Sequence, residues 1–403
     1  MRIYFPHNFL WGSSISSYQT EGGNTNSDWF LWEKKHSLER AGKSTDHFHL
    51  FKKDISLASL LSHNAFRFSL EWSRIYPQKK LLFYEALNHY REVIHLLKEN
   101  NIIPIVTLHH FTNPIWFAQE GGWLNYKLID EFIDYVRNVV IFFKKDVTYW
   151  LVFNEPLVYI YNGFIRGIWP PGLKSIKKSL SALKNILKAY ILSYEEIKNI
   201  YRGRTSYVSL AKNMRVFMPC FYMNFFQNNL YSFLRSYLFN FNILNYLTTR
   251  KYLDFIALNY YCGEFVKGDF SLWGRECKDP HHSLKRNALG WLIYPQGLYQ
   301  LLKRLKSYFI PIIITENGTA GSSEDEYLPF LISHIKSIAK AISEKVLIKG
   351  YFWWSLIDNF EWHCGYKYKF GLASVDFNDF SRKIRPFAWE YKKICENNYI
   401  EVE

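Results

Sequence analysis

Short apolar runs recur along the chain, and each is followed by a stretch long enough to hold a helix. Runs of this kind, closed by polar or turn-forming residues, are typical of parallel strands that are buried on both faces. The sequence contains eight of them, at residues 9–16, 65–72, 102–110, 149–155, 206–213, 254–261, 311–316 and 350–358. Eight strands that alternate with helices predict an α/β fold, a closed (β/α)8 TIM barrel, rather than an open doubly wound sheet.

The stretches between the runs support this prediction. In residues 84–100, apolar side chains recur every three or four positions and form one stripe, as in an amphipathic helix. Residues 128–144 and 328–345 follow the same pattern. No linker-like segment divides the chain, and we find no repeat beyond the strand–helix unit. We therefore expect residues 1–403 to form a single (β/α)8 domain.

The formal charge of +14 would allow a nucleic acid or an anionic membrane as partner. The lysines are spread along the chain, however, and no nucleic-acid-binding motif is found, so we expect no nucleic-acid partner. The five cysteines have no CxxC spacing. They indicate neither a disulfide framework nor a zinc site, and they fit a reducing compartment. Because no apolar segment resembles a signal peptide or a membrane span, the predicted location is cytoplasmic.

Polar and aromatic residues gather where the predicted strands end, which is where the active sites of such barrels are built. They are Gln19, Arg67, His110, Asn154, Glu155, Asn259, Tyr261, Glu316 and the segment from Trp354 to Trp362. Carboxylates combined with amides, an imidazole and tryptophans favour a sugar site. A metal would need His, Asp or Glu clustered at short spacing, and a dinucleotide would need a Gly-x-Gly-x-x-Gly motif. We predict neither a metal nor a cofactor.

The segments around these residues resemble the family 1 glycoside hydrolases, the β-glucosidase and β-glycosidase group. Eight segments match in the family's order: FLWGSSISSYQTEG at 9–22, FRFSLEWSRI at 66–75, NEP at 154–156, WPPG at 169–172, DFIALNYY at 254–261, GWLIYPQGLY at 290–299, ITENG at 314–318 and WSLIDNFEW at 354–362. Any one of them would be a weak signal, whereas eight in order exclude a chance match. The chain is shorter than typical members, chiefly between the fifth and sixth strands, which implies a compact member.

The resemblance implies a retaining mechanism with Glu316 as nucleophile and Glu155 as general acid and base. Retention requires two carboxyl groups about 5–5.5 Å apart, so that one of them attacks the anomeric carbon directly. Arg67 and Tyr261 match the partners that would keep the nucleophile ionised and oriented. Asn154 matches the residue that donates to the sugar 2-hydroxyl. Asn259 is a further support residue, with a purely structural role as the alternative.

The resemblance also implies a set of residues that bind the non-reducing sugar. Gln19, His110, Glu361 and Trp362 match the hydroxyl-binding positions, and Trp354 matches the stacking platform. Members that act on phosphorylated sugars replace the segment around Glu361, whose carboxylate would repel a 6-phosphate. The predicted substrates are therefore unphosphorylated glycosides.

One segment has an unusual composition. Residues 197–253 contain eight lysines and arginines and no acidic residue, and aromatic side chains crowd the middle of the segment. Residues 216–247 could rest on an anionic membrane surface as a peripheral contact, or line a site for hydrophobic aglycones. The alternative is that its helices simply pack their aromatic side chains against the barrel.

The leading hypothesis is an exo-β-glycosidase that hydrolyses β-D-glucosides by double displacement, with β-galactosides and β-fucosides as further substrates. One alternative is a transglycosylase, or a glycosidase that acts on lipid-linked glycosides at a membrane surface. Another is a non-catalytic sugar-binding barrel. That alternative is disfavoured because both glutamates are present.

Overall fold

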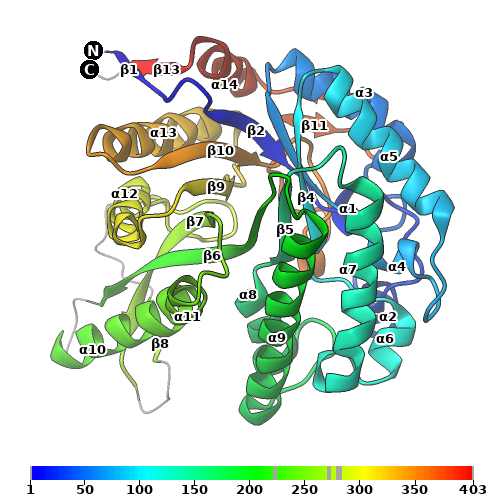
Figure 1. Ribbon diagram of the computed structural model, residues 1–403. Coiled ribbons are helices and arrows are strands. Elements are labelled where there is room, and N and C mark those ends of the chain that lie inside the picture. The colour runs from blue at the N-terminus through cyan, green and yellow to red at the C-terminus, as the bar shows by residue number, and fades with distance from the viewer. Residues whose placement is uncertain (1, 221–224, 270–273, 278–283, 402–403) are drawn as a thin grey trace.

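Eight parallel strands close into a barrel in the computed structural model (Figure 1), which describes residues 2–220, 225–269, 274–277 and 284–401. The strands are β2 (Leu10–Ser14), β3 (Ala65–Ser69), β4 (Ile103–His109), β5 (Tyr149–Asn154), β6 (Tyr207–Pro219), β7 (Ile256–Lys267), β9 (Ile312–Asn317) and β10 (Ile348–Trp354). Their order is β6-β5-β4-β3-β2-β10-β9-β7, and the pairing of β6 with β7 closes the barrel. The predicted (β/α)8 fold is confirmed, and each of the eight expected strands is present.

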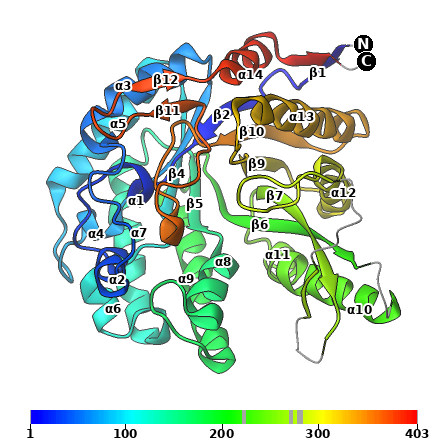
Figure 2. The same cartoon turned by 180° about the vertical axis from the view of Figure 1, so that it is seen from behind.

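Helices surround the strands on the outside of the barrel (Figures 1 and 2). The longer ones are α3 (His47–Leu60), α5 (Tyr84–Glu99), α7 (Ile129–Phe143), α9 (Ile176–Ile200), α12 (Pro295–Leu305), α13 (Tyr327–Ser343) and α14 (Pro386–Asn397). The helices expected at 84–100, 128–144 and 328–345 are α5, α7 and α13, with ends that agree within two residues. Their apolar stripes pack on the strands, as the periodicity predicted.

The interior of the barrel is filled with small and branched apolar side chains. This layer contains Leu10, Ala65, Ile105, Leu151, Ala211, Phe255, Ala257, Ile313 and Phe352. A much larger apolar cluster lies between the strands and the helices. Because apolar side chains occupy the interior below them, the polar residues at the carboxyl ends of the strands line the open end of the barrel.

Strands β6 and β7 extend well past their expected ends. The sequence predicted that they stop at residues 213 and 261, whereas they run to Pro219 and Lys267. The two extensions pair with each other in parallel, from Val216 with Gly263 to Pro219 with Val266. Helix α10 (Phe225–Arg235) and the π-helical segment η4 (Ser236–Phe241) pack on them, and β8 (Arg275–Glu276) pairs with β7. This β6–β7 extension projects from the barrel at the lower left of Figure 1.

A disulfide closes the β6–β7 extension, so the prediction of unpaired cysteines is wrong. The sulfur atoms of Cys220 and Cys277 are 2.04 Å apart. Backbone hydrogen bonds to β7 hold both cysteines next to each other. The Cys220 N–H donates to the Val266 carbonyl (2.9 Å), and the Cys277 N–H donates to the carbonyl of the preceding residue, Phe265 (2.8 Å). Nothing in the cysteine spacing shows this alignment. The argument from cysteine usage for a reducing compartment therefore loses its basis.

The two ends of the described chain lie together (Figure 1), because β1 (Arg2–Tyr4) pairs with β13 (Tyr399–Glu401) in an antiparallel ribbon. Among the described helices, none has the length and apolar character needed to cross a membrane.

Candidate active site

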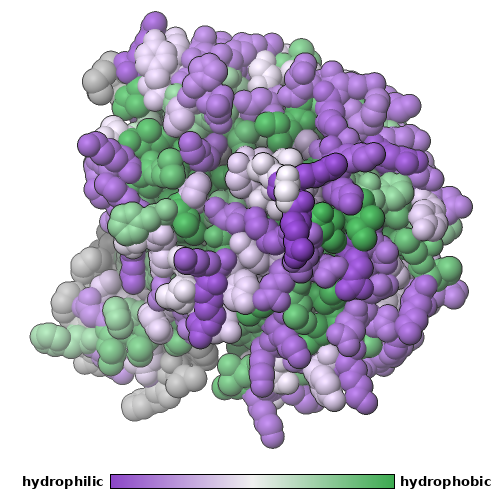
Figure 3. All heavy atoms as spheres, in the orientation of Figure 1, coloured by the Kyte–Doolittle hydropathy of each residue, from purple (hydrophilic) through white to green (hydrophobic). Residues whose placement is uncertain are grey.

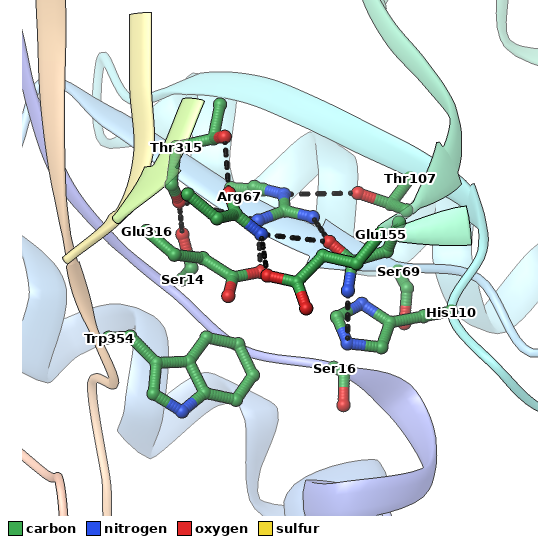
Figure 4. A network of polar contacts seen from close by, with 12 residues as sticks. Ser14, Ser16, Arg67, Ser69, Thr107, His110, Glu155, Thr315, Glu316 and Trp354 are labelled. Carbon is green, nitrogen blue, oxygen red and sulfur yellow. Dashed lines mark hydrogen bonds and ion pairs between the residues drawn. The ribbon is translucent and has the colours of Figure 1, made fainter. Parts of the chain in front are cut away.

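Two buried glutamates lie at the open end of the barrel, one at the end of β5 and the other at the end of β9. Glu316 is the fifth residue of β9, and Glu155 follows β5 directly. The backbone of Glu155 has a positive φ of 42°, and Pro156 then begins helix α8 (Pro156–Ile160). This sharp turn directs the Glu155 side chain towards the space that Glu316 faces (Figure 4). Glu155 is 7% exposed and Glu316 is 3% exposed, and their carboxyl groups interact electrostatically.

Arg67, on β3, connects the groups around Glu316. Its guanidinium forms an ion pair with one Glu316 carboxylate oxygen (Figure 4). It also donates to the side-chain oxygen of Asn154 at 2.7 Å. The Arg67 Nε–H donates to Thr107 Oγ1 at 3.2 Å. Arg67 is almost completely buried. One cation thus fixes side chains from three neighbouring or facing strands, β4, β5 and β9.

Tyr261 and Asn259, both on β7, hold one carboxylate each. The Tyr261 hydroxyl donates to the second oxygen of Glu316. The Asn259 Nδ2 donates to Glu155 Oε1 at 2.8 Å, and its own Oδ1 accepts from the Thr315 hydroxyl at 2.7 Å, which fixes the orientation of the amide. The amide of Asn259 therefore donates to the acid/base candidate, Glu155.

The ionisation of Glu316 reflects opposing influences. Burial raises the pKa of Glu316 to about 7, and the neighbouring Glu155 acts in the same direction. The Arg67 cation and the Tyr261 hydroxyl lower this pKa, but burial outweighs them.

Three predicted sugar-binding residues form one polar cluster beside the glutamates. Gln19, on the short helix α1 (Ser17–Thr20), donates to Glu361 Oε1 at 3.3 Å, and the indole N–H of Trp354 donates to the same oxygen at 3.3 Å. Burial, together with the nearby Glu316 and Glu155, raises the pKa of Glu361 to about 8. The next residue back, Trp353, lies outside the barrel in the helix-facing core. The structure thus places Trp354 rather than Trp353 at the site.

His110 and Trp362 complete one wall. The His110 ring is stacked on Trp354, with centroids 6.0 Å apart, and on Trp362, with centroids 6.2 Å apart. The amide nitrogen of Asn154 lies 3.1 Å from His110 Nε2. Burial lowers the pKa of His110 well below its ordinary value, so the ring is neutral and its Nε2 accepts from this amide. All the predicted site residues therefore lie around one space.

Sequence reasoning missed Asn213, on β6. Its Nδ2 donates to Glu155 Oε1 at 3.0 Å, so two amides, from Asn213 and Asn259, hold this carboxylate oxygen. Asn213 is the last residue of the predicted fifth strand. The rule that functional residues stand at the carboxyl ends of barrel strands would have identified it.

In the part of the chain that the structure describes, no group of three or more histidines, cysteines, aspartates and glutamates is arranged to hold a metal ion.

A barrel with two buried, interacting glutamates and a rim of amides and tryptophans defines the site of a glycoside hydrolase. The chain belongs to glycosyl hydrolase family 1, whose family model matches residues 1–224 and 222–400. It is a β-glycosidase-type enzyme by family, as the motifs predicted.

Several characterised relatives extend over almost the whole chain. A 1,4-beta-D-glucan glucohydrolase of Thermotoga neapolitana is 31% identical, covering 98% of both chains. The solved beta-glycosidase of Pyrococcus horikoshii is 33% identical and superimposes with a TM-score of 0.93, covering 100% of this chain and 97% of that one. A beta-glucosidase of Thermotoga maritima, solved with glucoimidazole, is 30% identical with a TM-score of 0.92 and covers 99% of this chain and 100% of its own.

Proposed function

We propose that the protein is a retaining exo-β-glycosidase that hydrolyses unphosphorylated β-D-glucosides and accepts β-galactosides and β-fucosides as further substrates. The observation that carries this proposal is the difference between the surroundings of the two glutamates. Glu316 accepts from a guanidinium and a phenol, of Arg67 and Tyr261. Glu155, in contrast, accepts hydrogen bonds from two amides, those of Asn213 and Asn259. A cation favours the charged form that a nucleophile needs. An uncharged amide N–H can donate to a carboxyl oxygen in either protonation state, which suits a group that must give and take a proton.

In this mechanism, the ionised Glu316 attacks the anomeric carbon while Glu155 gives its proton to the leaving-group oxygen. The product is a glycosyl ester on Glu316. Glu155, now ionised, takes a proton from a water molecule as the water oxygen attacks the anomeric carbon. The bond from this carbon to Glu316 breaks, Glu316 leaves as a carboxylate, and the second inversion gives a sugar with retained configuration. Asn154, held by Arg67 and His110, donates to the sugar 2-hydroxyl.

The charge of the site supports the choice of unphosphorylated sugars. Glu361 lies in the electrostatic field of Glu316 and Glu155, and its hydrogen-bond donors, Gln19 and Trp354, are both uncharged. A sugar 6-phosphate beside Glu361 would bring about two negative charges to a place where the donors that the structure describes are uncharged. A sugar hydroxyl requires no such compensation.

Covalent labelling tests the proposed chemistry. Incubation with a 2-deoxy-2-fluoro-β-glucoside should trap the glycosyl ester, and peptide mass mapping should locate it on Glu316. The variant Glu316→Gln should remain unlabelled. A label on another residue contradicts the assignment. Absence of both labelling and turnover favours the sugar-binding barrel instead.

Transglycosylation uses the same two glutamates, with a sugar or lipid hydroxyl in the place of water. Product analysis with an added alcohol or sugar acceptor separates the two reactions. Free sugar as the only product at high acceptor concentration rejects the transferase.

A second candidate function, action on amphiphilic glycosides at a membrane surface, is favoured by the exposed face of α10. On α10, Phe226, Leu230 and Phe233 follow helical spacing and are 90%, 55% and 62% exposed. Tyr237, in the adjoining η4, is 42% exposed. Figure 3 shows hydrophobic side chains at the lower left, where Figure 1 places α10. The remaining part of the expected contact at 216–247 includes residues 221–224, which lie outside the described residues.

Flotation with liposomes that contain anionic lipid tests this candidate. The protein should float, and the double variant Leu230→Ser/Phe233→Ser should float less. Phe309→Ser, which removes a phenylalanine that is 91% exposed outside this helix, serves as the matched control. Protein that stays wholly at the bottom rejects the membrane contact.

A further inference from the structure

A short part of β6, residues 211–213, holds Glu155 in place. The Glu155 N–H donates to the Ala211 carbonyl at 2.8 Å, and Asn213 Nδ2 donates to Glu155 Oε1 at 3.0 Å. Asn213 is paired with Asn259 of β7 in the register of the sheet, and the amide of Asn259 donates to the same oxygen. The position of the β6 backbone at these residues therefore determines where the Glu155 carboxyl group lies.

Lys212 lies between these two contacts, and its side chain is on the other face of β6. Successive residues of a strand point to opposite faces, so Lys212 points away from the site that Asn213 faces. Its ammonium group lies 4.2 Å from the centroid of the Phe239 ring in η4, which packs on β6. The same ammonium donates to the backbone carbonyl of Asn213. Lys212 thus binds the backbone of the residue whose side chain holds Glu155.

The strand is irregular directly after Asn213, because its register with β7 shifts between Met214 and Val216. Segment η4 contacts the backbone at this irregularity through Asn240. The Asn240 side chain accepts from the Arg215 N–H at 3.0 Å and donates to the Arg215 carbonyl at 2.7 Å. Side chains therefore bind the β6 backbone on both sides of Met214, with Lys212 on the side of the active site.

Stability alone does not explain a lysine at this position. Lys212 is 2% exposed, and no carboxylate forms an ion pair with it among the residues that the structure describes. It lines a small cavity together with Ile243, Leu244 and Leu247 of helix α11 (Asn242–Thr249). Burial lowers the pKa of Lys212 to about 7, and the carboxylate of Glu155 acts in the opposite direction. A buried ammonium without an ion pair destabilises a fold, so an apolar side chain would suit these surroundings better.

We propose that Lys212 is a positioning residue for Glu155, which acts through the backbone of Asn213 and aligns the Glu155 carboxyl group with the leaving-group oxygen. This inference rests on the proposed function, in which Glu155 gives its proton to that oxygen. Proton transfer requires hydrogen-bond geometry between the acid and the departing oxygen. A displacement of about 1 Å can reduce a rate about a hundredfold. Lys212 exerts this effect from the outer face of β6, without touching the substrate.

The variant Lys212→Met, which removes the ammonium group and keeps an apolar chain of similar length, tests the proposal with two glucosides. For phenyl β-D-glucoside, which needs the proton, kcat/KM should fall about tenfold. For 2,4-dinitrophenyl β-D-glucoside, whose leaving group departs without protonation, kcat/KM should change less than about twofold. The measured quantity is the ratio of the two values.

Lys198→Met is the matched control and should leave this ratio unchanged. Lys198 also donates to a backbone carbonyl, that of Ser206 at 2.9 Å, and lies 5.7 Å from the centroid of the Tyr194 ring. Ser206 directly precedes β6, at the end of the strand that is remote from Asn213.

A double-mutant cycle shows whether Lys212 acts through Asn213. Asn213→Ala alone should lower the ratio of phenyl to dinitrophenyl activity, because it removes one donor to Glu155. Lys212→Met in addition should lower the ratio little further, since the side chain through which it acts is absent. Additive losses in the double variant overturn the proposed route through Asn213.

The melting temperature separates positioning from a purely structural role. Lys212→Met should unfold at the same temperature as the wild type or at a higher one, because it removes a buried ammonium group. A lower melting temperature with equal losses for the two glucosides overturns the inference, and so does an unchanged ratio. If Lys212→Met does not fold, Lys212→Gln repeats the comparison under the same criterion. Cleavage of neither glucoside by the wild type overturns the proposed function instead.

Discussion

Glu316 and Glu155 are the same residue type in different surroundings, and their partners determine what each can do. Arg67 and Tyr261 engage both oxygens of Glu316, so its orientation is fixed. Glu155 keeps contact through one oxygen, Oε1, with two amide donors. Its second oxygen is thereby left to exchange a proton with substrate or water in the proposed mechanism.

Removing the acid should affect substrates according to their leaving groups. In Glu155→Gln the amide cannot protonate the departing oxygen, so a phenyl glucoside, which needs the proton, should lose about 10²–10⁴-fold in kcat/KM. A 2,4-dinitrophenyl glucoside leaves without protonation and should lose much less. Steady-state kinetics with both substrates measure the difference. Equal losses for the two would contradict the role of Glu155 as acid.

The pKa of Glu316 predicts an acidic limit for activity. Only the ionised carboxylate attacks, and burial raises its pKa to about 7, so kcat/KM should fall as the pH drops below about 7. Arg67 opposes this shift, and Arg67→Met should therefore move the limit to higher pH. Arg67→Lys, which keeps a cation, should move it less. A pH–rate profile that stays flat from pH 7 to pH 5 contradicts the prediction.

At the scale of elements, the β6–β7 extension joins the site to the outer part of the fold. The same strand that places Asn213 against Glu155 continues to Pro219 and then to the disulfide between Cys220 and Cys277. The disulfide closes a loop of 57 residues in sequence separation, which includes α10, η4 and α11. The covalent bond limits the freedom of this loop in the unfolded chain.

Breaking the disulfide should destabilise the protein. Cys220→Ser should lower the free energy of unfolding by about 2–4 kcal/mol, the usual range for closing a long loop. Denaturant unfolding without reductant measures the change. Cys395→Ser, which removes a half-buried free thiol, is the control. A reducing agent should lower the stability of the wild type but not of Cys220→Ser, and equal stability of the two proteins would contradict a folded-state disulfide.

At the scale of the whole molecule, the open end of the barrel concentrates buried acids in a protein that is positively charged overall. Burial raises the pKa of Asp28 to about 7, of Glu316 to about 7 and of Glu361 to about 8. Their unfolded values are close to 4. Between these limits the folded state binds more protons than the unfolded state, so stability decreases as the pH rises.

Thermal unfolding should show this dependence. The melting temperature should fall as the pH rises from about 5 to about 8, where the folded protein is forced to ionise these acids. Above about pH 8 the fall should end, because the acids are then ionised in both states. Lys212, whose pKa burial lowers to about 7, opposes the fall, because above that pH the unfolded state still binds its proton while the folded state does not. Glu361→Gln removes one of the acids and should have a shallower dependence. A melting temperature that rises from pH 5 to pH 8 contradicts the argument.

Much of the fold could be predicted because its signals are local. Each barrel strand is a short apolar run, and helices such as α5 show their periodicity within one segment. The extensions of β6 and β7 could not be predicted in the same way. Residues 214–219 read Met-Arg-Val-Phe-Met-Pro, an apolar run that an arginine interrupts and a proline ends. They form a strand because residues 263–266 lie beside them.

In the candidate site too, some features could be predicted from local sequence signals and others depend on contacts between distant segments. Glu316 and Glu155 stand at the ends of apolar strands, and the family motifs place their partners in order, so the sequence predicted which side chains belong together. Asn213 was overlooked although its strand was recognised, because an asparagine at a strand end is less distinctive than a glutamate. The contact of Asn259 with Glu155 depends on the amide orientation that Thr315 imposes.

The sequence by itself determined the number and order of the strands, the residues at their ends and the family to which the chain belongs, because periodicity and motif order are properties of the chain in one dimension. Only the tertiary structure decided the disulfide, the β6–β7 extension and the pKa of Glu316. These depend on distance and burial, which arise when segments far apart in the sequence come into contact and exclude water.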